Sequence, residues 1–327
     1  MNQRISEYAA LVTALVGLLI SEPARAQSYP AHFVTFVVPS PPGGVTDIDA
    51  RIIAKVLSVK IGRPVIVEPR PGAGGMIATE FVANAKPDGY TLLWASSGAI
   101  ATSPWIYKKK LAYDPFKSFT PIHTLQEASP ILLVSASSPF KSTADLVKYA
   151  KENPGKLNFG SAGNGTGQHI ALELFKLAAG FEATHVPYRA STQAMTDLLA
   201  GVIDATFDYY SPAKSQLESG KLRALSVTAS WRLPVLNDVP TLSELGYPVE
   251  WTGWSTVVAP AGTPPQIVDF LATAFAEALA APEVISHLEA TGTRVLPPKA
   301  KEGVEAFHRS ESEKVRRLVQ DSGISVE

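Results

Sequence analysis

Residues 36–47 read FVVPSPPGGVTD, and residues 157–168 read LNFGSAGNGTGQ. In each stretch a short apolar run, typical of a buried strand, ends in a glycine-rich loop without Lys or Arg, and the loop leads directly into a helical pattern. Such a loop offers bare backbone N–H groups and small hydroxyls beside the positive end of a helix dipole, which favours a bound anion. Two loops of this kind, about one domain length apart, predict two lobes that hold one anionic ligand.

Strand-like and helical segments alternate along most of the 327-residue chain. One series of expected strands spans residues 35–95 and a second spans residues 131–228, separated by a proline-interrupted stretch at residues 104–121. This alternation predicts an α/β fold of two lobes, each a mostly parallel sheet flanked by helices. Ligands of such sheets bind beyond the carboxyl ends of the strands, so we expect the ligand in the cleft between the lobes.

The lobes are expected to be built from interleaved parts of the chain. The helical segments after residue 259 have no strands for a third sheet, so we expect them to complete the first lobe. Residues 27–128 and 253–327 are therefore assigned to lobe 1 and residues 129–252 to lobe 2, and the chain crosses between the lobes twice. Two tandem lobes joined by one linker are the alternative.

The N-terminus has the pattern of an export signal. Arg4 precedes an apolar run at residues 9–20, and residues 24–26 (ARA) form an A-x-A cleavage site. The apolar run is too short to cross a bilayer, which needs about 20 residues. We therefore expect a signal peptide at residues 1–26, cleaved after Ala26, and a periplasmic mature protein.

Composition and charge exclude several classes of protein. The chain has no cysteine, so it forms no disulfide and no cysteine-ligated metal site. Its 29 Lys and Arg residues against 30 Asp and Glu residues give a net charge of −1. Nucleic acid and anionic membrane surfaces require clustered positive charge, and the basic run at residues 108–110 is typical of a solvated turn. We expect a monomer with no nucleic-acid partner.

The sequence lacks the motifs of several common enzyme classes. Neither Ser97 nor Ser161 lies in the G-x-S-x-G pattern of a hydrolase nucleophile, and no Gly-Lys-Ser/Thr P-loop occurs. Residues 163–168 lack the last glycine of a dinucleotide-binding loop. The 6 histidines are scattered, with no pair at the spacing of metal ligands. These observations predict a binding protein without catalytic activity, cofactor or metal.

Candidate ligand-binding residues cluster in the two glycine-rich loops and at predicted strand ends. In the first loop (residues 40–47) they are Ser40, Pro42, Gly43, Gly44, Thr46 and Asp47. In the second loop (residues 161–169) they are Ser161, Asn164, Gly165, Thr166 and His169. The candidates near strand ends are Ser97, Arg189, Asp208 and Trp254.

Four of these side chains have more than one interpretation. His169 either donates to a ligand carboxylate or bonds to a neighbouring carbonyl, and Arg189 either forms a bidentate carboxylate contact or lies on the surface. Asp208 cannot attract an anion, so we expect it to orient a loop or to accept a proton or hydroxyl of the ligand. Tryptophans are more often core residues than site residues, and Trp254 is the one that we expect at the site.

Several motifs together point to a known family. They are VPSPPGGVTD at residues 38–47, RPGAGG at 70–75, KPDGYTLL at 86–93 and APAGTP at 259–264. With them the chain resembles the TctC/Bug family of extracytoplasmic solute receptors, the binding proteins of tripartite tricarboxylate transporters. The resemblance covers essentially the whole mature chain. It implies a type II-like, two-lobe periplasmic binding protein that closes on a carboxylate, and a membrane partner with one large and one small subunit.

The resemblance also implies roles for individual loops. The first and second loops of family members hold ligand carboxylates, largely through backbone N–H groups and water, and the residue matching Asp208 is commonly in the cleft. This chain has Ser40 where the family commonly has Phe, and the loss of an aromatic wall leaves the solute open among di- and tricarboxylates and aromatic carboxylates. The alternatives to a transport receptor are a ligand sensor for a signalling partner, and a hydrolase or isomerase, which requires a nucleophile and a base in contact, for instance Ser161 with His169.

Overall fold

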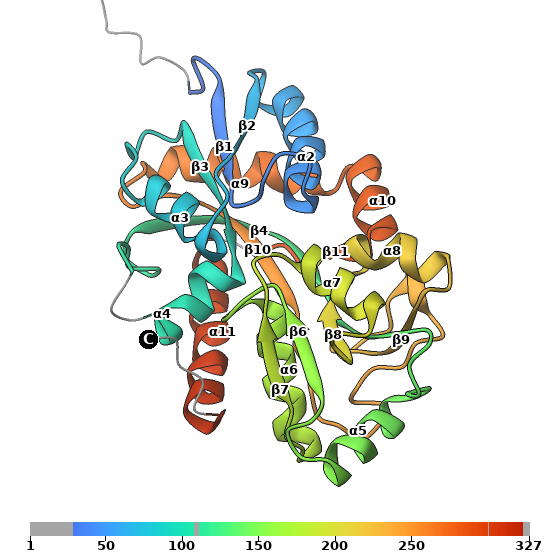
Figure 1. Cartoon of the computed structure of the whole chain (residues 1–327). Coiled ribbons are helices and arrows are strands. Elements are labelled where there is room, and N and C mark those ends of the chain that lie inside the picture. Colours follow the sequence, from blue (N-terminus) through green and yellow to red (C-terminus); the bar gives the residue numbers. More distant parts are fainter. Residues whose placement is uncertain (1–28, 108–110, 300, 323–327) are drawn as a thin grey trace, which may run out of the picture.

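We describe residues 29–107, 111–299 and 301–322 of a computed structural model of the protein. The predicted signal peptide at residues 1–26 and the basic run at residues 108–110 lie outside these ranges. Within them, each helix is too short or too polar to cross a membrane. The strands form two separate sheets, and helices cover both faces of each sheet (Figure 1).

The first sheet consists of β1 (Val34–Val38), β2 (Val65–Pro69), β3 (Thr91–Ser96), β4 (Phe119–Ala128), β10 (Gly253–Pro260) and β11 (Thr293–Val295). Its strand order is β11-β4-β10-β3-β1-β2. The first four strands of the chain run in one direction, whereas β10 and β11 run antiparallel to the strands that they pair with.

Alternation of side chains along the strands builds a core on each face of the first sheet. Phe36 of β1 packs on one face with α2 (Val45–Ile61), α9 (Pro265–Leu279) and α10 (Pro282–Ala290). Its neighbour Val37 packs on the other face, with α3 (Met76–Ala83). Only one side of α2 meets the sheet, so its buried apolar residues recur at helical spacing. They are Ala50, Ile53, Ala54, Leu57 and Ile61.

The second sheet consists of β5 (Ile131–Ser135), β6 (Asn158–Ser161), β7 (Thr184–Pro187), β8 (Ala205–Asp208) and β9 (Leu222–Val227), in the order β7-β6-β8-β5-β9. β5 is antiparallel to both of its neighbours, and the other strands share one direction. One face packs on α5 (Thr143–Glu152) and α6 (Gly167–Ala179), and the other on α7 (Ser191–Ala200) and α8 (Tyr210–Glu218).

The chain passes between the two sheets twice. It leaves the first sheet from β4 into β5, and it returns through β10, whose Gly253 pairs with Ala128 at the end of β4. Two helices from outside residues 131–227 also pack on the second sheet. They are α4 (Ser103–Ile106) and α11 (Lys301–Ser322), which contribute Ile106 and Val315 to its core. The predicted α/β class with two lobes is confirmed, but both sheets are mixed and not mostly parallel, because β10, β11 and β5 run antiparallel to their neighbours. The lobe boundaries after residues 128 and 252 stay a prediction.

Candidate functional site

A cavity of about 580 Å³ lies between the two sheets, and we call it the central cavity. It is found at the carboxyl ends of β3, β4 and β8 and at the adjoining starts of β10 and β11, which is where α/β sheets bind ligands. Its lining residues are Pro41, Gly44, Val45, Thr46, Trp94, Ser96, Ser97, Gln126, Ala128, Gln168, Ala190, Ser191, Thr192, Asp208, Tyr209, Ser211, Pro212, Gly253, Trp254, Ser255, Thr291 and Thr293. This set from the described part of the chain contains no Lys, Arg or His.

Three helices begin at the wall of the central cavity. The residues that precede their first turns, Gly44 for α2, Ala190 for α7 and Tyr209 for α8, line the cavity, and none forms a side-chain hydrogen bond that caps its helix. The first amides of a helix have no partner within it, so their N–H groups are open to a ligand. The positive ends of three helix dipoles therefore converge on one cavity, which favours an anion without any cationic side chain.

A second hollow, of about 650 Å³, lies at the carboxyl ends of two helices that pack on the second sheet. It is lined by residues from the last turns of α5 and α6, including Lys151, Leu177 and Gly180. Helix carboxyl ends carry the negative end of the dipole, which disfavours an anion. The central cavity is therefore the candidate site.

The first loop is held by Asp47, in the first turn of α2. The Gly43 N–H donates to Asp47 Oδ2 (2.9 Å), and Arg51 donates through Nε (2.9 Å) and Nη2 (3.0 Å) to the same carboxylate. The hydrogen bonds from Arg51 lower the pKa of Asp47. Gly43 has a φ of +77°, a conformation that glycine adopts without strain. Asp47 is thus engaged with its own loop, while Gly44 and Thr46 of this loop line the cavity.

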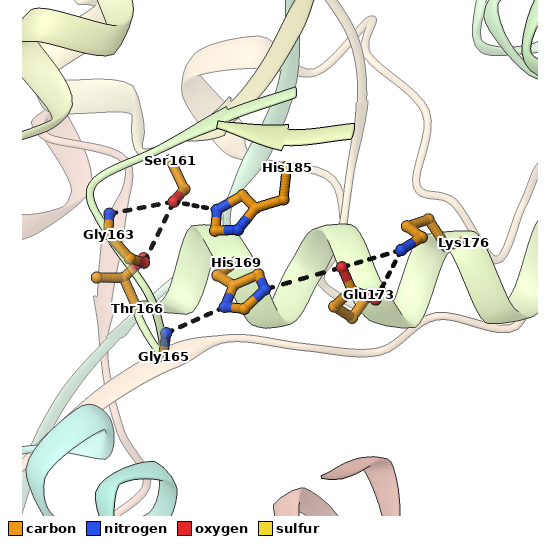
Figure 2. A network of polar contacts seen from close by, with 8 residues as sticks. All are labelled: Ser161, Gly163, Gly165, Thr166, His169, Glu173, Lys176 and His185. Atoms are coloured by element: carbon orange, nitrogen blue, oxygen red, sulfur yellow. Dashed lines mark hydrogen bonds and ion pairs between the residues drawn. The ribbon is translucent and has the colours of Figure 1, made fainter. Parts of the chain in front are cut away.

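The second loop is also closed by its own hydrogen bonds (Figure 2). Thr166 Oγ1 donates to the Gly163 carbonyl (2.8 Å), and the Gly163 N–H donates to Ser161 Oγ (3.1 Å). The Gly165 N–H donates to His169 Nδ1 (3.0 Å), so His169 accepts a hydrogen bond from a neighbouring amide and does not donate through Nδ1 to a carbonyl. Of residues 161–169, all of which are described, Gln168 is the one that lines the central cavity.

Two imidazoles stack beneath the second loop. The rings of His169 and His185 are 3.9 Å apart and 5° from parallel, and His185 Nε2 lies 2.6 Å from Ser161 Oγ. Burial lowers the pKa of His169 to about 3 and that of His185 to about 4, so both rings are neutral near pH 7. Because His169 Nδ1 accepts a hydrogen bond, its proton resides on Nε2, 3.8 Å from Glu173 Oε1.

This pair does not assemble a hydrolase site. The hydrolase alternative requires a nucleophile in contact with a base, for instance Ser161 with His169. Ser161 Oγ instead contacts His185 Nε2 (2.6 Å), and neither residue lines the central cavity. Ser161 is only 1% exposed. The described residues also contain no group of three or more His, Cys, Asp or Glu side chains suited to a metal ion.

Asp208 ends β8 with its carboxylate at the central cavity. Asp208 Oδ1 accepts hydrogen bonds from the Tyr209 N–H (2.8 Å) and from Gln168 Nε2 (3.4 Å). Burial raises the pKa of Asp208 to about 6, and these two donors lower it. The carboxylate therefore orients the start of α8 and remains an acceptor facing the site.

Aromatic rings form the apolar part of the wall. Trp94 and Trp254 line the cavity, and Trp254 is fixed from behind, since its Nε1 donates to Glu311 Oε2 of α11 (3.2 Å). Tyr209 reaches toward the returning strand: a Cβ on Gly253 would lie 2.4 Å from Tyr209 Oη. Glycine at that position thus permits the close approach of the tyrosine.

The remaining candidates lie outside the lining set. Ser40, Pro42 and Gly43 adjoin it in the first loop, and Asn164 is exposed. The Arg189 side chain is exposed, and its backbone N–H donates to Gln193 Oε1 (3.2 Å) at the start of α7. Its neighbour Ala190 lines the cavity instead.

Sequence reasoning named 5 of the 22 lining residues as candidates and missed the other 17. The missed polar ones are Ser96, Gln126, Gln168, Ser191, Thr192, Tyr209, Ser211, Ser255, Thr291 and Thr293. The rule that helix starts bind anions, applied to every predicted helix, would have found the residues that open α7 and α8. Gln126 lies in β4, a strand that the sequence pattern did not predict.

Comparisons with known proteins identify the family of the chain. A family profile described as "Tripartite tricarboxylate transporter family receptor" (TctC) matches residues 49–324. The UPF0065 protein in the tcbD-tcbE intergenic region of Pseudomonas sp. (strain P51) is 38% identical over 297 residues, 90% of this chain and 88% of that protein.

Two solved structures are similar over nearly their whole length. R. palustris Rpa4515 with adipate is 35% identical, with a TM-score of 0.83 over 91% of this chain and 99% of that one. MatC (Rpa3494) from Rhodopseudomonas palustris with bound malate is 33% identical, with a TM-score of 0.79 over 89% of this chain and 100% of that one.

The fold and the cavity between its sheets define a two-lobe periplasmic binding protein. Within that class, the chain belongs to the TctC family of tripartite tricarboxylate transporter receptors. The predicted family is thereby confirmed. Its family and its structural neighbours are substrate-binding proteins. This protein is likewise a substrate-binding protein and not an enzyme.

Proposed function

We propose that the mature protein, released by cleavage after Ala26, is a periplasmic receptor that captures a small carboxylate in the central cavity. It then delivers the solute to a tripartite tricarboxylate-type transporter with one large and one small membrane subunit. The observation that carries this proposal is the convergence of three uncapped helix starts on a cavity without a cationic side chain. The adipate and malate of the two similar structures support a carboxylate.

Within the site, we assign direct ligand contact to the predicted residues that line the cavity: Gly44, Thr46, Ser97, Asp208 and Trp254. The amides of Val45 and Thr46 supply donors at the start of α2, because the Gly44 N–H is already donated to the Pro41 carbonyl (3.0 Å). Trp254 packs on the carbon chain of the ligand. Ser40, Pro42, Gly43 and Asp47 shape the first loop. Contact by the second loop or Arg189 stays a prediction that requires further closure of the lobes.

The direct test is isothermal titration of the mature protein with aliphatic mono-, di- and tricarboxylates and with aromatic carboxylates. We expect saturable heat with at least one member and a matching rise in the unfolding temperature, because a ligand that binds only the folded state stabilises it. The amide analogue of the bound acid, which lacks the negative charge, is the control and should not bind. Flat titrations across the whole panel would contradict the proposal.

The transport role needs a separate experiment. Deletion of the gene should abolish uptake of the radiolabelled carboxylate that the titration identifies, and a plasmid copy should restore it. A deletion strain with normal uptake but altered gene expression on exposure to the solute would favour the sensor over the transport receptor.

A further inference from the structure

Thr228 holds both crossings of the chain to the second sheet. It follows β9 and is 0% exposed. Its N–H donates to the Pro130 carbonyl in the first crossing (3.0 Å), and its Oγ1 donates to the Trp251 carbonyl in the second (2.7 Å). The Trp251 N–H donates back to the Thr228 carbonyl (2.9 Å). Pro130 and Trp251 therefore move together with the second sheet.

The residues on the other side of each crossing are held by the first sheet. Thr252 Oγ1 donates to Glu127 Oε2 of β4 (3.0 Å), and Gly253 pairs with Ala128 at the end of the same strand. Rotation of one sheet against the other is thereby confined to a few backbone bonds at residues 128–130 and 251–253, which we call the hinge. Gly253 is the residue at which the second crossing joins the first sheet.

Tyr209 reaches the hinge from the wall of the central cavity. It precedes α8 and lines the cavity, and a Cβ on Gly253 would lie 2.4 Å from its Oη and 3.1 Å from its Cζ. A Cβ on Gly167, the first residue of α6, would lie 2.3 Å from the same oxygen. Because α6 and α8 pack on the second sheet and Gly253 belongs to the first, the hydroxyl packs between the two lobes at the hinge.

The need for this space explains the two glycines, and their backbone conformation does not. Neither Gly167 nor Gly253 has a positive φ, so alanine could adopt either conformation. Tyr209 is anchored at its backbone, since its N–H donates to Asp208 Oδ1 (2.8 Å). Protein interiors are close-packed, so a side chain that is held at one end and enclosed at the other transmits a displacement to its neighbours.

We propose that Tyr209 is a positioning residue that couples the central cavity to the hinge. Its hydroxyl, packed against Gly253, holds the lobes at their resting angle, and a solute that meets the same side chain in the cavity wall releases them. This inference rests on the proposed function, because it needs a solute in the central cavity. A contact beside the pivot suits this role, since a small shift there becomes a large movement at the far ends of the lobes.

The angle between the lobes can be followed with two spin labels, because the chain has no cysteine of its own. Lys55→Cys on α2 and Lys148→Cys on α5 place one exposed label beside each sheet (Figure 1). Pulsed electron paramagnetic resonance of the mature protein then gives the distribution of distances between the labels. For the wild type we expect one ligand-free distance and a different one with saturating adipate or malate, or with another acid of the titration panel if neither binds.

Gly253→Ala introduces the colliding methyl group and should shift the mean ligand-free distance away from the wild-type value. Tyr209→Phe in the same background removes the hydroxyl and should reverse most of this shift. Tyr210→Phe is the matched control, because Tyr210 is the adjacent tyrosine, is 7% exposed and lies outside the cavity lining. In the Gly253→Ala background this control should reverse nothing.

Tyr209→Phe alone tests the resting contact without an added methyl group. Its ligand-free distances should broaden to include the value that the wild type shows only with the bound acid. This variant decides the question if circular dichroism shows that Gly253→Ala does not fold, and an unchanged distribution would then overturn the inference.

The possible failures are distinguishable. The inference is overturned by an unshifted distance in folded Gly253→Ala, by a shift that Tyr209→Phe does not reverse, or by wild-type distances that a bound acid leaves unchanged. Each of these results leaves the proposed function standing, because binding is measured separately by titration. Absence of binding heat with every acid of the panel would contradict the proposed function and the coupling with it.

Discussion

Asp47 shows how one side chain can serve a site that it does not line. Its carboxylate accepts hydrogen bonds from Gly43 in the first loop and from Arg51 one turn further along α2. The two contacts tie the loop to the helix that it precedes. The amides of Val45 and Thr46 therefore hold their positions at the cavity wall before any ligand arrives, which limits the ordering that binding requires.

Replacement of Asp47 by Ala should loosen the first loop and weaken binding. We expect the free energy of unfolding to fall by about 1–3 kcal/mol, because the Gly43 amide and Arg51 lose their acceptor. The affinity for the carboxylate should fall about tenfold. Urea unfolding and isothermal titration measure the two effects.

Arg51→Gln is the control for this change. It removes the cation but keeps the bond between Gly43 and Asp47, and the Arg51 side chain is 52% exposed. Its effect on stability should be below about 1 kcal/mol, as for exposed ion pairs. If both variants weakened binding equally, the ion pair and not the loop contact would hold the amides.

Residue types alone predicted part of the cavity wall. Gly44, Thr46, Ser97, Asp208 and Trp254 follow strands or begin helices, and such positions can be read from hydrophobic periodicity. Local sequence does not reveal where the hydroxyls of the second loop point. Thr166 Oγ1 and Ser161 Oγ have partners inside their own loop, and those partners depend on the turn at Gly163.

At the scale of elements, helix starts were predictable and one central strand was not. The helical pattern expected directly after the first loop agrees with α2 (Val45–Ile61), since its apolar residues recur at helical spacing. β4 carries Pro121, and proline is unusual inside a sheet. The pairing of β10 with β4 shifts register between Val257 and Val258, opposite His123 and Pro121, so the proline lies at an irregularity that tolerates it.

The open amides at the start of α2 can be tested by a proline. Val45 is the first helical residue, where proline fits, and Gly44 has the extended conformation (φ −70°, ψ 162°) that a following proline requires. Val45→Pro removes one N–H from the cavity wall and should keep the fold. A hydrogen bond to a charged group contributes about 1.5–3 kcal/mol, so titration should show affinity about 10- to 100-fold weaker.

Val45→Ala provides the comparison, because it shortens the same side chain and retains the amide. Its affinity should stay within about threefold of wild type. Equal affinities for the proline and alanine variants, with circular dichroism showing both folded, would mean that the α2 amide does not contact the ligand.

At the scale of the whole molecule, buried imidazoles make stability depend on pH. His308 of α11 is 3% exposed and lies 2.9 Å from Thr256 Oγ1 of β10. Burial lowers its pKa from 6.5 to about 4, and the pKa values of His169 and His185 are lowered for the same main reason. Between these folded values and 6.5 the unfolded chain binds more protons, so acidification favours unfolding.

We therefore expect the free energy of unfolding to decrease as the pH falls from 6.5 to 4. His308 alone accounts for up to ~3 kcal/mol of this change, since one pKa unit corresponds to about 1.4 kcal/mol. Asp208 acts in the opposite direction, because its raised pKa of about 6 lets the folded protein take up a proton first. Urea unfolding curves at several pH values measure the sum.

His308→Gln isolates one of these contributions. Glutamine can still bond to Thr256 but does not titrate, so the variant should lose less stability than wild type between pH 6.5 and 4. An identical pH profile for the two proteins would show that His308 is not neutral and buried in the folded state.

The strand order of the first sheet has a consequence for folding during synthesis. β10, at residues 253–260, is inserted between β3 and β4, which the ribosome completes more than a hundred residues earlier. The second sheet uses only residues 131–227 and closes shorter loops. We expect the second sheet to form before β10 has been synthesised, when β3 and β4 still lack the strand that pairs with both of them. A chain truncated before residue 253 would keep that exposed gap between β3 and β4, a template for misassembly with other chains.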